Sequence, residues 1–70
     1  MTEDQAMMRC RRLFGEETMA VHGGVWRLRQ RERPGKLERV LAAVELDVRE
    51  GKPIRHRGAY ATFLWNMFAD

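Results

Sequence analysis

One stretch of the sequence, between Pro34 and Pro53, has a pattern that strongly favours a single secondary structure. Its apolar residues recur at i, i+3, i+4, i+7 and i+11, which places them on one side of an α-helix. They are Leu37, Val40, Leu41, Val44 and Val48. Pro34 suits the first helical turn, where its missing N–H is not needed, and Gly51 suits the left-handed position after a helix. The pattern predicts a helix over 35–50 that buries this stripe.

The beginning of the chain predicts a second amphipathic helix, over 3–14. Thr2 and Gln5 fit a capping box, in which each side chain bonds the backbone of the other residue. Inward-facing residues follow at helical spacing, and Gly15 ends the helix. The inward residues are Ala6, Met7, Cys10, Leu13 and Phe14.

Between these two helices the sequence is less regular. Residues 16–22 predict a short helical turn in which Met19 points inward, with Val21 or His22 beside it. The two adjacent glycines that follow would cost about 2 kcal/mol inside a helix relative to alanine. We therefore predict a break in the chain at this glycine pair.

Residues 25–33 fit two interpretations. At a period of two, four arginines and a valine share one face, as in a basic strand; at a period of 3.6, Arg27 lies above Arg31 on a helix. Leu, Arg, Gln and Glu favour helix, and the sequence offers no convincing second strand for pairing. We predict a helix here and keep the strand as the alternative.

The last segment predicts a helix over 58–68, after a connector over 51–57. This helix carries apolar residues around most of its circumference, which is typical of a helix at the centre of a core or in contact with a partner. A chain of 70 residues cannot bury all of it. We therefore predict that Trp65 and Phe68 contribute to a partner interface.

Together these segments predict an all-α fold, a small bundle of four to five short helices in one domain over 1–70. The stripe of 35–50 would pack against the first and last helices. A chain this short buries only about 60% of the surface that its unfolded form exposes, so its stability is marginal. The single cysteine, Cys10, excludes an internal disulfide, and no zinc-type spacing of Cys and His occurs.

The sequence also bears on location. Its first turn is acidic and polar, whereas a signal peptide begins with basic and then apolar residues. No apolar run approaches the roughly 20 residues of a membrane span. We expect an intracellular, cytoplasmic protein that has no membrane contact, and a single free thiol fits a reducing compartment.

Charge is the strongest functional signal. The chain has a net charge of +3, yet residues 23–36 have a balance of +4 and residues 51–58 a balance of +3, which leaves −4 for the remainder. Clustered arginine beside an otherwise acidic body indicates an anionic partner. Arginine meets the closely spaced phosphates of DNA with bidentate, charge-assisted hydrogen bonds.

We therefore predict a small nucleic-acid-binding protein, with DNA as the first candidate, that contacts the phosphate backbone through both basic segments. The predicted contacts are Arg27, Arg29, Arg31, Arg33, Lys52, Arg55 and Arg57. The alternatives are a solvated arginine face, an adaptor or inhibitor that binds a protein through Trp65 and Phe68, and a homodimer that buries the last helix. Trp26 fits either a core position or stacking on a base.

Catalytic chemistry is not indicated. Cys10 lies on the inward side of its helix, and His22 beside two glycines fits a helix end. No nucleophile is paired with a base, and no phosphate-binding glycine loop is present. We expect no enzymatic activity, no cofactor and no bound metal.

The C-terminal half contains a motif in which a helix ends in glycine, a basic connector follows and an aromatic helix comes last. The motif comprises Gly51, Lys52, Pro53, Ile54, Arg55, His56, Arg57, Gly58, Ala59 and Tyr60. It resembles the C-terminal segment of plasmid and phage replication proteins and of related small mobile-element proteins, whose connector reads G-x-x-I-R-N-P-G-A-Y. Here His56 and Arg57 replace the Asn-Pro pair, which makes the connector more basic. The resemblance implies a helical replication-accessory or DNA-contacting role, without polymerase, primase or helicase activity.

Overall fold

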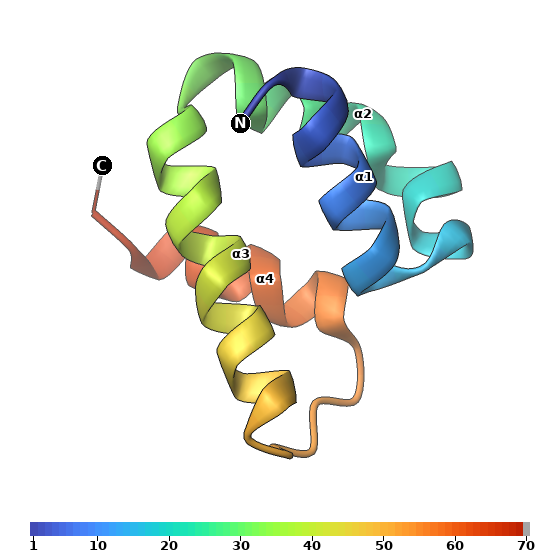
Figure 1. The fold of residues 1–70 in the computed structure, drawn as a ribbon, viewed down its shortest axis with the longest axis vertical. Coiled ribbons are helices and arrows are strands. Elements are labelled where there is room, and N and C mark those ends of the chain that lie inside the picture. Colours follow the sequence, from blue (N-terminus) through green and yellow to red (C-terminus); the bar gives the residue numbers. More distant parts are fainter. Residues whose placement is uncertain (70) are drawn as a thin grey trace.

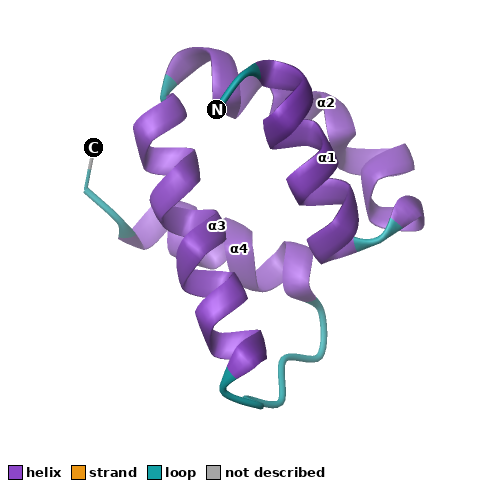
Figure 2. Cartoon of the chain, viewed as in Figure 1, coloured by secondary structure: helices purple, strands orange, loops and turns teal. Residues whose placement is uncertain are grey.

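The computed structural model describes residues 1–69, which form four helices (Figures 1 and 2). They are α1 (Glu3–Phe14), α2 (Glu16–Glu32), α3 (Pro34–Arg49) and α4 (Arg57–Met67). The described residues contain no strand, so the predicted all-α class is confirmed. In Figure 1, α1 and α3 lie toward the viewer, and α4 crosses behind α3. Within 1–69, no helix combines the length and apolar character that crossing a bilayer requires.

The start and end of α1 follow the prediction. Thr2 Oγ1 accepts a hydrogen bond from the Gln5 N–H at 3.1 Å, and Gln5 Oε1 accepts one from the Thr2 N–H at 2.9 Å. Gly15 follows with a φ of 95°, a conformation that favours glycine. This single residue turns the chain directly from α1 into α2.

The predicted break at Gly23 and Gly24 is wrong, because α2 continues through both glycines. Met19 and Trp26 lie two turns apart on one side of α2 and are 8% and 2% exposed. Burying one large apolar side chain stabilises the folded state by about 1.5–3 kcal/mol. Burial of these two side chains therefore offsets the cost of the glycine pair. The helical interpretation of residues 25–33 is confirmed, and the strand alternative is wrong.

The continuity of α2 also decides which residues point inward. The buried side runs from Met19 through Trp26 to Gln30, at spacings of seven and four residues. Val21 and His22 are both exposed, so the expectation that one of them lies beside Met19 in the core is wrong. The predicted short turn and the helix after it are one element, which makes four helices rather than five.

The predicted stripe on α3 forms the centre of the core. Its four most buried residues, Leu37, Val40, Leu41 and Val44, are fully removed from solvent, and Val48 packs at the edge. They meet Cys10 and Leu13 of α1 and Ala61 of α4. Burial raises the pKa of the Cys10 thiol to about 11, which fits an unreactive core residue.

Trp26 is a core residue, and a cluster of rings and cations surrounds it. The Phe14 ring lies 4.8 Å from it, centroid to centroid. The Arg29 guanidinium carbon lies 4.5 Å from the centre of the Trp26 ring and 5.2 Å from that of Trp65, and Lys36 Nζ lies 4.7 Å from the Trp65 ring. These cation–π contacts join α2, α3 and α4.

The connector between α3 and α4 is fixed at both ends by Asp47, which is only 9% exposed. Tyr60 of α4 donates its hydroxyl to one carboxylate oxygen at 2.5 Å, and Lys52 Nζ contacts the other at 3.0 Å. These hydrogen bonds, that of Tyr60 first, hold the pKa of Asp47 below its usual value. Gly51 takes the predicted left-handed conformation, with a φ of 78°. The connector therefore has a defined path past the other helices.

Candidate nucleic-acid interface

The seven basic residues predicted to contact phosphate do not form one surface. On α2, Arg27 and Arg31 reach Glu3 at the N-terminal end of α1. In the connector region, Arg57 donates to the carbonyl oxygen of Leu13, near the C-terminal end of α1, at 3.2 Å. Ten residues of helix separate these two points, about 15 Å. Arg27 and Arg31 therefore lie near one end of α1 and Arg57 near the other.

One carboxylate offsets much of the charge of the first group. Arg27 Nη1 lies 2.7 Å from Glu3 Oε2, and Arg31 Nε lies 2.5 Å from Glu3 Oε1. The hydrogen bonds from Arg31 and then Arg27 hold the pKa of Glu3 below its usual value. Glu3 is thus ionised at neutral pH and cancels one of the two positive charges.

Arg29 and Arg33 occupy different surroundings again. The Arg29 side chain is half-buried against two indole rings and donates to Thr62 Oγ1 at 3.3 Å. Removal from water lowers its pKa. Arg33 is exposed at the junction of α2 and α3. The structure thus places Arg29 in the packing between α2 and α4.

Of the three predicted contacts in the connector region, one is neutralised by carboxylates and two are not, within residues 1–69. Lys52 pairs with Asp47 and also lies 3.9 Å from Glu50. Arg55 is exposed and Arg57 bonds a backbone carbonyl, and neither has a carboxylate partner among residues 1–69. Of the second predicted segment, Arg55 and Arg57 retain their full charge toward solvent.

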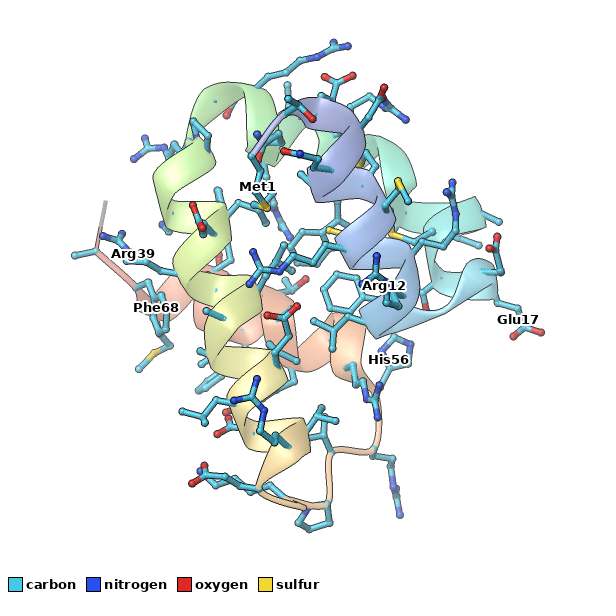
Figure 3. All side chains as sticks on the ribbon, in the orientation of Figure 1. Met1, Arg12, Glu17, Arg39, His56 and Phe68 are labelled. Atoms are coloured by element: carbon cyan, nitrogen blue, oxygen red, sulfur yellow. The ribbon has the colours of Figure 1, made fainter. Side chains whose placement is uncertain are left out.

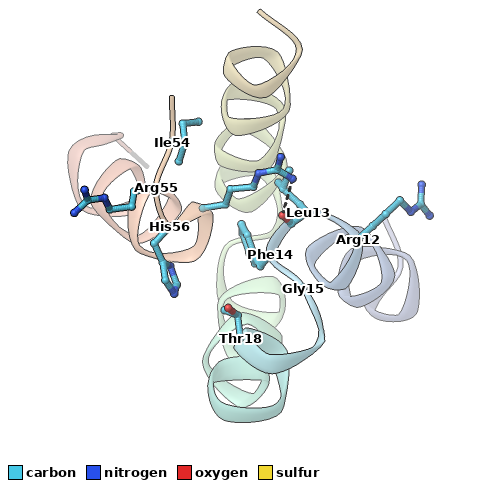
Figure 4. A pocket seen from close by; sticks show the side chains of 9 residues that line it. Arg12, Leu13, Phe14, Gly15, Thr18, Ile54, Arg55 and His56 are labelled. Carbon is cyan, nitrogen blue, oxygen red and sulfur yellow. Dashed lines mark hydrogen bonds between the residues drawn. The ribbon is translucent and has the colours of Figure 1, made fainter. Parts of the chain in front are cut away.

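A hollow of about 350 Å³ opens where the connector passes the turn between α1 and α2 (Figure 4). We term it the basic hollow. Its lining residues are Arg12, Leu13, Phe14, Gly15, Thr18, Ile54, Arg55, His56 and Arg57. Three arginines and no carboxylate line it. In Figure 4, Arg12 and Arg55 extend outward on opposite sides of the hollow.

Arg12 is the member of this site that sequence reasoning misses. It lies in the last turn of α1, where a cation is already explained by the helix dipole. Only the path of the connector, more than forty residues later, gives this arginine basic neighbours. Within the described part of the chain Arg12 has no ion pair, and Figure 3 shows it on the same side of the molecule as His56.

Two helix N-termini, those of α2 and α4, border the basic hollow. Gly15 precedes α2 and offers no side-chain cap, so the first N–H groups of α2 lack an internal acceptor. At α4, the Ala59 N–H donates to His56 Nδ1 at 3.0 Å. Because His56 Nδ1 accepts this hydrogen bond, the neutral ring carries its proton on Nε2, and this N–H can donate to a bound ligand. Glu16, in the first turn of α2, is drawn toward Arg11 at 3.5 Å.

The basic hollow therefore gathers donors: guanidinium N–H groups, an imidazole N–H and backbone N–H groups near two positive helix ends. Such a set matches the oxygens of a phosphate group. In the range 1–69, no three His, Cys, Asp or Glu side chains lie together as metal ligands do.

The aromatic residues predicted at a partner interface are less exposed than expected. Trp65 and Phe68 are partly buried and pack against the core. The exposed apolar residues of α4 are Phe63 and Met67, at 55% and 66%. The reason is the direction in which α4 crosses α3: it turns Ala61, Leu64 and Phe68 inward, and it turns Phe63 and Met67 outward.

Comparisons with known proteins add nothing to this geometry. No family model matches the chain, and searches of curated proteins and of solved structures found no match. The resemblance of residues 51–60 to replication proteins thus stays a prediction.

Proposed function

We propose that the protein binds the phosphate backbone of nucleic acid through the basic hollow. The observation that carries this proposal is that Arg12, Arg55 and Arg57 line one opening, which no carboxylate lines. Of these, Arg12 and Arg55 are long, exposed side chains whose guanidinium groups have no ion-pair partner within 1–69. They can turn toward a phosphate without first breaking a salt bridge.

The geometry favours recognition of backbone over recognition of sequence. Guanidinium and backbone N–H groups contact phosphate oxygens, and such contacts position a protein without reading bases. The buried ring of Trp26 is removed from any role in stacking on a base. We expect affinity for duplex DNA of any sequence. The affinities for RNA and for single-stranded DNA should differ from it according to the spacing of their phosphates.

A replication-accessory role in a plasmid, phage or related element is the finer part of the proposal. Its support is the resemblance of residues 51–60 to the connector of replication proteins. In this structure that same segment supplies Arg55, His56 and Arg57 to the basic hollow. Where that connector has Asn-Pro, this chain has His56, which caps α4, and Arg57, which adds a cation.

The proposal is tested by fluorescence anisotropy with labelled random duplex DNA, single-stranded DNA and RNA. Three phosphate contacts predict a slope of log K against log salt of about −2.7, which is about a 40-fold loss of affinity for duplex DNA between about 50 and 200 mM salt. Arg12→Gln and Arg55→Gln should each make the slope shallower by about 0.9.

Arg31→Gln is the matched control, because it removes the same charge from an exposed arginine that is already paired with Glu3. If the basic hollow is the site, Arg31→Gln should leave the slope nearly unchanged. The proposal is wrong if binding does not depend on salt, or if Arg31→Gln weakens binding more than Arg55→Gln does. Circular dichroism of each variant checks that the fold is retained.

A further inference from the structure

The side of α2 that faces away from the core carries an ordered pattern of its own. Its central residues are spaced by four, three, four and three positions, as in the contact line of a coiled coil. We term this line the outward seam; its residues are Glu17, Val21, Gly24, Leu28 and Arg31. Val21 is 75% exposed and Leu28 is 53% exposed, so large apolar groups on this line face solvent.

Of the outward seam, Arg31 bonds Glu3 of α1, whereas the two large apolar residues, Val21 and Leu28, take no part in the core. The core uses the opposite side of α2, through Met19, Trp26 and Gln30. No side chain within 1–69 covers Val21 or Leu28 enough to bury it. The first half of α2, cyan in Figure 1, forms the right-hand edge of the molecule and is open to contact from outside.

The outward seam is complementary to itself when a second copy runs in the opposite direction. Gly24 is the midpoint both of the seam and of α2 (Glu16–Glu32). An antiparallel copy centred on Gly24 places Glu17 opposite the other copy's Arg31, and Val21 within one residue of the position opposite its Leu28. The two charged ends then attract, the apolar residues meet, and the helix dipoles oppose each other. A parallel copy would instead place Glu17 against Glu17 and Arg31 against Arg31.

Gly24 is the residue that lets the two helices approach closely at their crossing point. Packing within the chain does not require a glycine here, since a Cβ added at Gly24 would meet nothing within 4 Å. A glycine inside a helix is unfavourable, so a position that needs none for its own packing calls for another explanation. Close contact with a second backbone supplies one.

We propose that the protein forms a symmetric dimer in which α2 packs antiparallel against α2 of a second copy through the outward seam. Glu3 is bonded by both Arg27 and Arg31. When Arg31 turns to Glu17 of the second copy, Glu3 therefore keeps Arg27 as its partner. Thr18, which lines the basic hollow, lies on the neighbouring side of α2 and outside the outward seam. The two surfaces adjoin, because Glu17 and Val21 of the outward seam share a shallow depression with Thr18 and His56 of the basic hollow.

The dimer should be weak. α2 has 17 residues and is about 25 Å long, so the contact spans little more than two heptads. Interfaces well below about 1,200 Å² are typical of transient association. We expect a dissociation constant of about 10–100 µM, and the dimer should therefore appear only in concentrated solution.

Cysteine cross-linking tests the geometry. Gly24→Cys places a thiol beside the symmetry axis, where the two copies lie within disulfide reach. Val21→Cys is the matched control, because antiparallel pairing puts this position near Leu28 instead of its own copy. In a glutathione buffer, Gly24→Cys should cross-link at least tenfold faster than Val21→Cys. The native Cys10 is buried and should not contribute. Equal rates, or a faster Val21→Cys, overturn the proposal.

Sedimentation velocity of charge-reversed variants tests the pairing independently. Glu17→Arg and Arg31→Glu should each remain monomeric at about 300 µM, where the unmodified protein dimerises. An equimolar mixture of the two should dimerise, because each copy then meets the opposite charge at both ends. The proposal fails if the unmodified protein stays monomeric at that concentration, or if the mixture behaves as the separate variants do. Thermal melts of each variant show whether the fold survives.

Discussion

Gly24→Ala should stabilise the folded monomer. Gly24 lies in the middle of a continuous helix, and its backbone is helical and needs no positive φ. A new Cβ would meet no atom within 4 Å. The substitution thus changes the backbone entropy and helix propensity without disturbing any packing in the chain.

The size of the effect follows from these observations. Glycine in a helix interior is about 1 kcal/mol less favourable than alanine. At position 24 the alanine Cβ would clash with nothing, so the whole of this difference should appear in the free energy of unfolding. For a chain of this length, 1 kcal/mol corresponds to about 4–8 °C in melting temperature. Gly23→Ala should add a similar amount, because its Cβ would meet only Met19 Cε, at an ordinary 3.8 Å.

Thermal denaturation followed by circular dichroism measures this at about 5 µM, a concentration at which the dimer proposed above is dissociated. Gly58→Ala is the control with the opposite sign. Its Cβ would lie 3.0 Å from Thr18 Cγ2 and 3.2 Å from His56 Cε1, where α4 approaches α2 closely. We expect Gly58→Ala to lower the melting temperature by several degrees.

A decrease in melting temperature for Gly24→Ala would refute the continuity of α2. In that case the chain would leave helical geometry at the glycine pair, as the sequence alone suggests, and Met19 and Trp26 would no longer share one side. An increase for both Gly24→Ala and Gly58→Ala would keep the helix but contradict the close approach of α4 to α2.

Three further predictions concern titration and packing. The free energy of unfolding should fall as the pH drops below about 4, because the lowered pKa of Asp47 contributes stability only while its carboxylate is ionised. Urea denaturation at several pH values measures this, and Tyr60→Phe should make the decrease below pH 4 smaller. The thiol of Cys10, with its pKa raised to about 11, should not react with a disulfide reagent at pH 8 until guanidinium chloride unfolds the chain. Arg29→Gln should cost about 1–2 kcal/mol in urea denaturation, because it removes a half-buried cation from between two indole rings.

Periodicity alone predicts most of the fold. The stripe on α3 and the capped α1 emerge with boundaries within one residue of those observed, because both patterns are local and amphipathic. The glycine pair is the exception. Helix propensity there is overridden by the burial of Met19 and Trp26 on either side, and that contribution depends on partners from other helices.

The candidate site was only half predictable, for a related reason. Arg55 and Arg57 stand out in a short basic segment, whereas Arg12 acquires its significance only when the connector passes beside the end of α1. Charge counting also treats all arginines as equal. In the fold, Glu3 bonds both Arg27 and Arg31, and two indole rings hold Arg29, so three arginines of the most arginine-rich segment already have partners within the chain.

That difference has a physical origin in where each segment is placed. The arginines of α2 belong to a helix packed on two sides, so neighbouring acidic and aromatic side chains are within reach of them. The connector is held at its two ends by the contacts of Asp47 with Lys52 and Tyr60, and its middle projects toward solvent. Arginines in such a segment keep their charge for an external anion. If Tyr60→Phe loosens this anchor, phosphate binding should weaken even though no residue of the basic hollow has changed.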